Sequence, residues 1–95
     1  MRTPWGTADS IVRLPHGIIA VTTPSHGGYY VPIVALRAIP ARFQAYAARF
    51  SGSPQWYEED CAWACVAVTY PDAFPPEAQA HARDVIARYV DRPQV

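Results

Sequence analysis

The first third of the chain alternates short β-branched runs with turn residues. Residues 10–14 and 18–23 are such runs, and residues 15–17 (Pro-His-Gly) between them are typical of a tight turn, so we predict a β-hairpin. Residues 24–28 are expected to form a loop whose two glycines allow a positive φ or a close approach of the backbone. With a short third strand at residues 29–31, the N-terminal half is predicted to be a short antiparallel three-stranded β-meander.

From Pro32 onward, apolar residues recur at helical spacing. Residues 32–38 predict one or two helical turns with Pro32 at the first position, where its missing N–H is not needed. Residues 40–50 predict a longer helix, because large apolar side chains lie three and four positions apart. The expected inner face of this helix consists of Phe43, Tyr46, Ala47 and Phe50.

A third helix is predicted from about residue 54 to residue 69. Ser53 would cap it, Pro54 would take its first position, and the negative charges of residues 58–60 would complement the helix dipole. Its broad apolar surface indicates that it is the central helix. The expected inner face consists of Tyr57, Cys61, Ala64, Cys65 and Val68, with Trp56, Trp63 and Ala67 on its flank.

A last helix is predicted from Pro75 and Pro76 to about Val90. Its expected inner stripe consists of Ala78, Ala82, Val85, Ile86 and Tyr89. Its expected outer pairs, four positions apart, are Glu77 with His81 and Asp84 with Arg88. The chain is therefore predicted to be a single α+β domain over residues 1–95, in which three to four helices pack against the three-stranded meander.

The balance of charges argues against nucleic acid as a partner. Eight basic and eight acidic residues leave no net charge, and every fixed positive side chain is Arg, because the chain contains no Lys. Without a basic stripe, direct binding of nucleic acid is not expected. The N-terminus lacks the apolar segment of a signal peptide, and no apolar run approaches the ~20 residues that cross a bilayer. We therefore expect a cytoplasmic location without membrane contact.

Residues 25–28 (Ser-His-Gly-Gly) are the first candidate site. A His between small residues on a loop is accessible and can serve as a base or as a ligand. The alternative is a tight turn in which His26 is hydrogen-bonded to neighbouring backbone. Glycines in loops more often allow a particular backbone conformation than take part in a reaction, so the interpretation as a tight turn is favoured.

The acidic run Glu58-Glu59-Asp60 after Trp56 is the second candidate. Three consecutive carboxylates suit a metal site or acid–base catalysis, but consecutive helical residues point about 100° apart and do not converge. A helix start that matches the dipole is favoured. The alternative is an exposed acidic patch beside Trp56 that binds an arginine of a partner protein.

Cys61 and Cys65 are the third candidate. The two cysteines are four positions apart, so on a helix both thiols would lie on one face. Two thiols on one face could supply half of a metal site. The neighbouring residues are apolar, so buried packing is favoured, and we expect neither a metal nor a cofactor. No cation adjacent in sequence would lower a thiol pKa, although His26 could approach Cys61 in space.

Trp5, followed by Gly6, is the fourth candidate. A Trp near an N-terminus usually packs over the core, and Trp is also enriched in binding hot spots. Large rings such as Trp5, Trp56, Trp63, Phe43 and Phe50 are expected to build the core from few residues. The expected partner-binding set consists of Trp5, His26, Trp56, Glu58, Glu59 and Asp60, without a catalytic residue.

Several separated motifs together resemble an uncharacterised small domain of phage, plasmid and other mobile-element proteins. The resemblance covers about half of the chain, in residues 3–31 and 56–74. The matching motifs lie outside residues 32–55 and 75–95. The motifs are Pro4-Trp5-Gly6, then Thr23-Pro24-Ser25-His26-Gly27-Gly28, then Trp56-Tyr57-Glu58-Glu59-Asp60-Cys61-Ala62-Trp63, and then Phe74.

The resemblance implies a function, because it places the chain among proteins of mobile elements. Short proteins of mobile elements are often inhibitors of host defence. We therefore expect an anti-CRISPR protein of the host cytosol that binds a subunit of a CRISPR-Cas effector and is not an enzyme. One alternative is a small enzyme or metal-dependent protein with His26, Cys61 and the acidic residues in one cleft. The other is an interaction module whose motifs only specify the fold. Exposed aromatic residues would also allow a symmetric homodimer.

Overall fold

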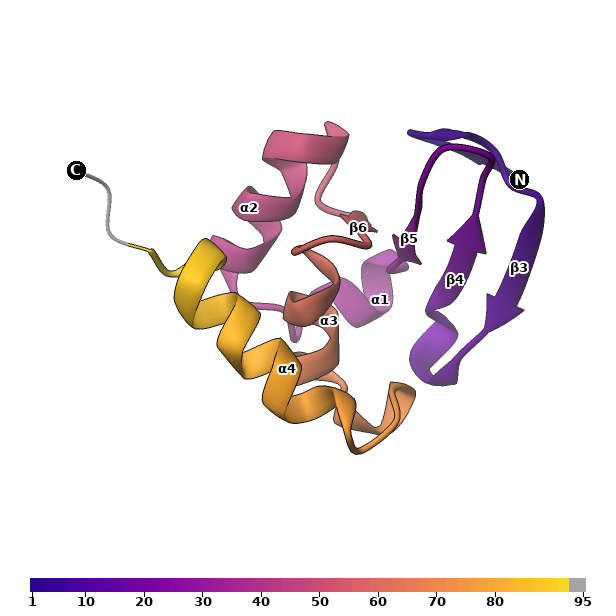
Figure 1. The fold of residues 1–95 in the computed structure, drawn as a ribbon. Coiled ribbons are helices and arrows are strands. Elements are labelled where there is room, and N and C mark those ends of the chain that lie inside the picture. Colours follow the sequence, from indigo (N-terminus) through magenta and orange to yellow (C-terminus); the bar gives the residue numbers. More distant parts are fainter. Residues whose placement is uncertain (93–95) are drawn as a thin grey trace.

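An antiparallel sheet and a group of helices form the two sides of the molecule (Figure 1). The computed structural model describes residues 1–92 and has the predicted α+β class. The predicted domain extends to Val95, and residues 93–95 lie outside the described range. Within residues 1–92, no helix is both long enough and apolar enough to cross a membrane.

The predicted three-stranded meander is confirmed, and the sheet contains one strand more. Its order is β3-β4-β5-β6, and all neighbouring strands are antiparallel. The strands are β3 (Ser10–Arg13), β4 (Ile19–Thr22), β5 (Gly27–Tyr30) and β6 (Trp56–Glu58). A separate two-stranded hairpin, not predicted from the sequence, consists of β1 (Arg2–Thr3) and β2 (Gly6–Thr7).

The helix predicted over residues 54–69 is the largest error, because its first part is strand β6. Tyr57 pairs with Tyr29 of β5, and backbone hydrogen bonds from Val31 N to Gln55 O (2.8 Å) and from Glu59 N to Gly27 O (3.0 Å) extend the pairing. Hydrogen bonding to β5 thus replaces the helical bonds that local periodicity favoured. The helical part is α3 (Trp63–Thr69), so Ser53 does not cap a helix.

The other predicted helices are confirmed with small shifts of their ends. They are α1 (Ile33–Leu36), α2 (Ala41–Ser51) and α4 (Ala78–Val85), which continues as a π-helical turn over Ile86–Val90. Two residues assigned to inner faces are exposed, namely Phe50 at 56% and Tyr89 at 52%. Each lies in the last turn of its helix, and Val90, the residue after Tyr89, still packs against the core. Among the predicted ion pairs, Asp84 and Arg88 are joined at 3.0 Å, whereas His81 packs against Trp63.

The core lies between the helices and the β5–β6 part of the sheet. Tyr57 of β6 is fully buried in it, together with most of α3. The residues with no exposed surface are Ile18, Val31, Ala47, Tyr57, Ala62, Ala64, Cys65, Val66, Ala67 and Ala82.

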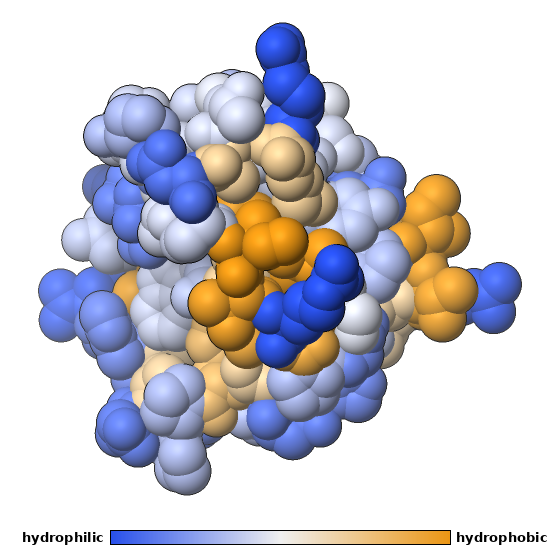
Figure 2. Space-filling view, turned by 90° about the vertical axis from the view of Figure 1, so that its right-hand side faces the viewer, coloured by the Kyte–Doolittle hydropathy of each residue, from blue (hydrophilic) through white to orange (hydrophobic). Residues whose placement is uncertain are grey.

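Strand β3, at the far edge of the sheet, has no such cover. All four of its residues are exposed, including 43% of Ile11 and 56% of Val12. Figure 2 shows the resulting group of hydrophobic side chains in the middle of this face, surrounded by polar ones. The sheet is therefore covered at its β6 end and open at its β3 end.

Candidate functional site

A pocket of about 440 Å³ lies beside the covered end of the sheet. Four separate segments form it: the β1–β2 turn, the β4–β5 turn, the second half of α2, and β6 with the residues that follow it. The residues that line it are Trp5, His26, Tyr46, Phe50, Glu58, Asp60 and Cys61. Candidate residues from distant parts of the sequence thus converge on one concave surface.

Trp5 forms one wall of the pocket, and the backbone at Gly28 makes room for its ring. A Cβ atom added at Gly28 would lie 2.7 Å from Cζ3 of Trp5 and 2.6 Å from the carbonyl oxygen of Tyr57. This position of β5 therefore requires glycine for a close approach and not for a positive φ. Of the two interpretations of the loop glycines, the close approach is confirmed for Gly28. Both Gly27 and Gly28 are buried in strand β5, so the predicted loop ends two residues early.

Trp56 supports this wall from the neighbouring strand. Its ring meets that of Trp5 edge to face, with centroids 5.8 Å apart and planes at 89°, and lies 5.1 Å from the ring of Tyr30. These three rings form an aromatic layer on the sheet, and such contacts add about 0.5–1.5 kcal/mol per pair to the gain from burial. Trp56 itself is not among the residues that line the pocket, so its role there is to position Trp5.

Glu58 holds the turn between β6 and α3. Its Oε1 accepts hydrogen bonds from the backbone N–H groups of Cys61 (2.9 Å) and Ala62 (2.6 Å), and its Oε2 accepts one from that of Asp60 (2.7 Å). The carboxylate satisfies N–H groups of the turn ahead of α3. The interpretation of the acidic run as the first turn of a helix is wrong, because Glu58 ends strand β6 and no acidic residue lies in the first turn of α3. Glu58 also lines the pocket, so its charge remains part of the site.

The carboxylates of Glu59 and Asp60 have different environments. Glu59 Oε2 accepts a hydrogen bond from the N–H of Gly27 at 2.7 Å and lies 3.8 Å from Nδ1 of His26. Asp60 lines the pocket, and its carboxylate forms no hydrogen bond within residues 1–92. The three consecutive carboxylates therefore have three different environments, and only Asp60 offers its oxygens to the pocket without an internal partner among the described residues.

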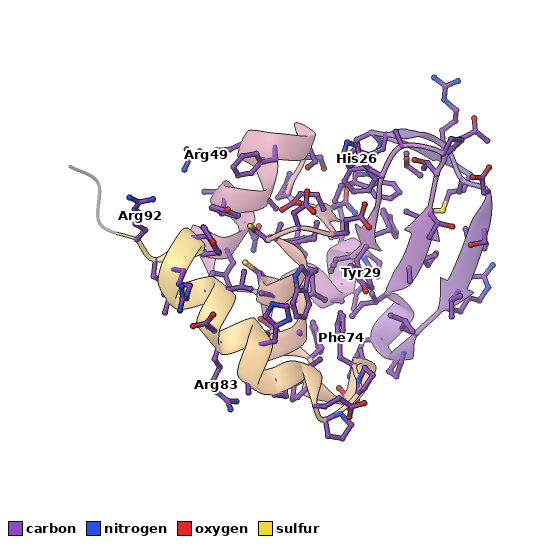
Figure 3. All side chains as sticks on the ribbon, viewed as in Figure 1. His26, Tyr29, Arg49, Phe74, Arg83 and Arg92 are labelled. Atoms are coloured by element: carbon purple, nitrogen blue, oxygen red, sulfur yellow. The ribbon has the colours of Figure 1, made fainter. Side chains whose placement is uncertain are left out.

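His26 lies at the end of the sheet, where β4 leads into β5 (Figure 3). Thr23 fixes the turn: its Oγ1 donates to the carbonyl oxygen of His26 (2.7 Å) and accepts from the N–H of His26 (3.1 Å). The backbone of His26 is thus held as the turn interpretation expects, while its ring, 56% exposed, faces Glu59 at the pocket.

The two cysteines have different positions, contrary to the prediction that they share a helix face. Cys65 is buried in α3, and burial raises the pKa of its thiol to about 12. Cys61 precedes α3 and is half-buried in the pocket wall. Burial raises the pKa of its thiol, the charges of Glu58 and Asp60 raise it further, and a hydrogen bond with Tyr46 acts in the opposite direction. At neutral pH the protonated thiol is therefore the favoured form of both residues.

The aromatic residues of α2 are the part of the pocket that the sequence analysis missed. Tyr46 and Phe50 were assigned to the inner face of the helix, and their ring centroids lie 5.0 Å apart. Burial raises the pKa of Tyr46 to about 12, so its hydroxyl stays protonated. Phe50 is one turn later and lies outside the core. Its position immediately before Ser51-Gly52, where the helix ends, is the one local signal that this ring faces outward.

Across residues 1–92, no three side chains of His, Cys, Asp or Glu lie close enough together to hold a metal ion. The carboxylates of Glu58 and Glu59 already accept hydrogen bonds from different backbone segments. The pocket is therefore an aromatic and acidic surface.

Comparison with known families gives a match over nearly the whole chain. The model of a family described as a domain of unknown function, DUF7007, matches residues 1–93, which is nearly the whole chain. No curated protein and no solved structure matches.

Proposed function

We propose that this chain, which belongs to the DUF7007 family of domains of unknown function, is a protein-binding module whose partner docks at the pocket. The observation that carries the proposal is the convergence of Trp5, His26, Glu58 and Asp60 on one concave surface. Aromatic residues in pockets are the side chains on which binding energy concentrates. The aromatic walls and the carboxylate of Asp60 provide apolar and polar contacts together.

The chemistry of the pocket favours binding over catalysis. A nucleophilic cysteine needs a lowered pKa, and burial raises the pKa of Cys61. The carboxylate of Glu58 is occupied by three backbone N–H groups, so it is poorly placed to transfer a proton to a substrate. These contacts fix the shape of the surface, which suits a preformed binding site.

The finer proposal is that the partner is a subunit of a host defence complex. On this proposal, the chain is an anti-CRISPR protein of a phage or other mobile element. It acts in the host cytosol by occluding a CRISPR-Cas effector. The resemblance of its motifs to mobile-element domains supports this.

The test is co-expression of the chain with tagged CRISPR-Cas effector complexes. We expect copurification with one effector and a loss of interference, measured as restored plating of a targeted phage. Asp60→Asn and Phe50→Ala should weaken both, because they remove the charge and an exposed ring from the pocket. Asp9→Asn and Tyr89→Ala are the matched controls, because both residues are exposed and lie outside the pocket.

Two outcomes would count against the proposal. If no effector copurifies and interference is intact, the defence-inhibitor assignment is wrong. If an effector is inhibited equally by the pocket variants and the control variants, the partner does not dock at the pocket.

An enzymatic function is the second candidate, because the structure does bring His26, Cys61 and the acidic residues together. His26 Nδ1 lies 3.8 Å from Glu59 Oε2, which would orient the ring as a base once the atoms move closer. Alkylation of Cys61 with iodoacetamide distinguishes the enzymatic function from the binding function. If Cys61 is an enzyme nucleophile, its thiol should react at neutral pH much faster than free cysteine. His26→Ala would abolish that difference while leaving the fold intact.

A further inference from the structure

We infer that the pocket takes the guanidinium group of an arginine side chain presented by the partner protein. The inference rests on the proposed function, since it names the chemistry of the group that docks there. It follows from the charge of the pocket, from the free acceptor at Asp60, and from the behaviour of the protein's own arginines on the same helix.

The charge of the pocket selects a cation. Its lining includes two carboxylates, Glu58 and Asp60, and neither Lys nor Arg, while Glu59 lies beside the rim next to His26. The lining also contains the imidazole of His26, the thiol of Cys61 and the hydroxyl of Tyr46. The thiol and the hydroxyl stay uncharged at neutral pH because burial raises their pKa values. An anionic ligand would be repelled here, and a cation would be attracted.

Asp60 supplies the acceptor that such a cation needs. Within residues 1–92 its carboxylate forms no hydrogen bond, whereas Glu58 uses both oxygens on backbone N–H groups. A free carboxylate can accept two parallel N–H donors from one guanidinium, which is the geometry of the stronger ion pairs. Glu58 adds negative charge close by without competing for the same donors.

The aromatic walls favour a planar cation over a compact one. Trp5, Tyr46 and Phe50 line the pocket, and a guanidinium stacks on such rings more readily than the strongly hydrated ammonium of lysine. A pocket of about 440 Å³ also lies within the range of about 300–1,000 Å³ that is typical of sites for small ligands. A single long side chain therefore fits this site.

The protein's own arginines show that the rings of α2 attract guanidinium groups. The guanidinium carbon of Arg49 lies 6.0 Å from the ring centroid of Tyr46 and 5.6 Å from that of Phe50, and that of Arg42 lies 4.4 Å from the ring of Phe43. Figure 3 places Arg49 on the side of α2 away from His26. The two rings thus already contact one guanidinium and present their remaining surface to the pocket.

The test uses three blocked tripeptides, Ac-Gly-Arg-Gly-NH₂, Ac-Gly-Lys-Gly-NH₂ and the citrulline analogue, titrated into the ¹⁵N-labelled chain of residues 1–95. Citrulline keeps the size and shape of arginine without its charge. We expect the arginine peptide to shift the Trp5 indole resonance and the amides of residues 60–62, with millimolar affinity. The lysine and citrulline peptides should bind at least about fivefold more weakly.

Asp60→Asn should lower the affinity for the arginine peptide at least about fivefold, and Phe50→Ala about threefold. Asp9→Asn and Tyr89→Ala should leave it unchanged, and the dispersion of each variant's spectrum verifies that it folds. Equal binding of the three peptides, or an Asp60→Asn variant that binds like the wild type, would overturn the inference. Tighter binding of free L-arginine than of the peptide would also overturn it, because the source would then be a metabolite.

The two proposals fail in distinguishable ways. If the effector binds through the pocket and the arginine peptide does not bind, the proposed function stands and the guanidinium assignment is wrong. If the peptide binds as expected and no effector copurifies, the assignment stands and the defence partner is wrong.

Discussion

The two ends of the four-stranded sheet have opposite environments. At the β6 end, Tyr57 is fully buried under the helices, and Trp5 and Trp56 form an aromatic layer on the sheet. At the β3 end, Val12 is 56% exposed, and the strand has a neighbour on one side only. The pocket lies at the covered end, so the residues that build the fold and those that build the candidate site are neighbours.

This arrangement explains why motifs far apart in the sequence contribute both to the fold and to the candidate site. Gly28 lets Trp5 approach the sheet, and the N–H of neighbouring Gly27 binds the carboxylate of Glu59. The same segments present His26 and Asp60 to the pocket. A motif residue at the covered end therefore cannot be assigned to structure or to function from its motif alone. Substitutions at these residues are needed to distinguish a structural role from a role in binding.

The largest expected effect is that of Gly28→Ala at the covered end. The added Cβ would lie 2.6 Å from the carbonyl oxygen of Tyr57 and 2.7 Å from Cζ3 of Trp5, which forces the ring or the strand to move. We expect a loss of about 3 kcal/mol in the free energy of unfolding, measured by urea denaturation. A loss below about 1 kcal/mol would show that the aromatic layer is loosely packed.

Trp5→Ala provides the double-mutant control for this change. Because the ring of Trp5 is one of the two obstacles, Gly28→Ala should cost less in the Trp5→Ala background than in the wild type. Equal costs in the two backgrounds would mean that the clash with the backbone of Tyr57 dominates.

The next effect in size separates the two cysteines. Cys65 has no exposed surface, so it should react with iodoacetamide at least about a hundredfold more slowly than Cys61, through opening of α3. Burial raises the pKa of Cys61, so less of it is thiolate at pH 8 than in free cysteine, and its rate should keep rising at pH values where that of free cysteine has levelled off. Peptide mapping by mass spectrometry measures both rates, and urea should make them equal.

The sequence predicted what local patterns determine. The hairpin of β3 and β4 and the helix α2 were found because turn residues and helical periodicity are read within a few positions. Strand β6 was missed because Glu58 pairs with Gly28, thirty residues earlier in the chain, and the residues after it have helical periodicity. Such pairing depends on the tertiary structure, which overrides local preference.

The candidate site was predicted as separate parts. Trp5, His26 and Asp60 were each named, but their convergence depends on the placement of β6 and of the N-terminal hairpin. Tyr46 and Phe50 were missed as pocket residues, because helical periodicity assigns a face and does not show where the core ends. Phe50 shares its face with buried Phe43, yet it lies beyond the core.

A smaller effect of opposite sign is expected for Tyr57→Phe. Among residues 1–92, the hydroxyl of Tyr57 is buried without a hydrogen-bond partner, and burial raises its pKa. Removing the hydroxyl should stabilise the fold by about 1 kcal/mol in urea denaturation, because an unsatisfied buried group is lost. Tyr70→Phe is the matched control and should destabilise by about 1 kcal/mol, since the Tyr70 hydroxyl donates to the carbonyl oxygen of Ala35 at 2.6 Å. Destabilisation by Tyr57→Phe of the same size would show that its hydroxyl has a partner in solution.

The smallest effect is expected at the open end, for Val12→Thr. Val12 is 56% exposed on the edge strand, and threonine keeps the β-branched shape, so the free energy of unfolding should change by less than about 0.5 kcal/mol. The same change at Val31, which has no exposed surface, should cost about 2 kcal/mol, because a hydroxyl would be buried in the core. Urea denaturation at several protein concentrations measures both, and a cost at Val12 that approaches the cost at Val31 would contradict the contrast between the two ends. If that cost grew with protein concentration, β3 would be covered by a second molecule in solution, since an exposed edge strand readily pairs with another chain.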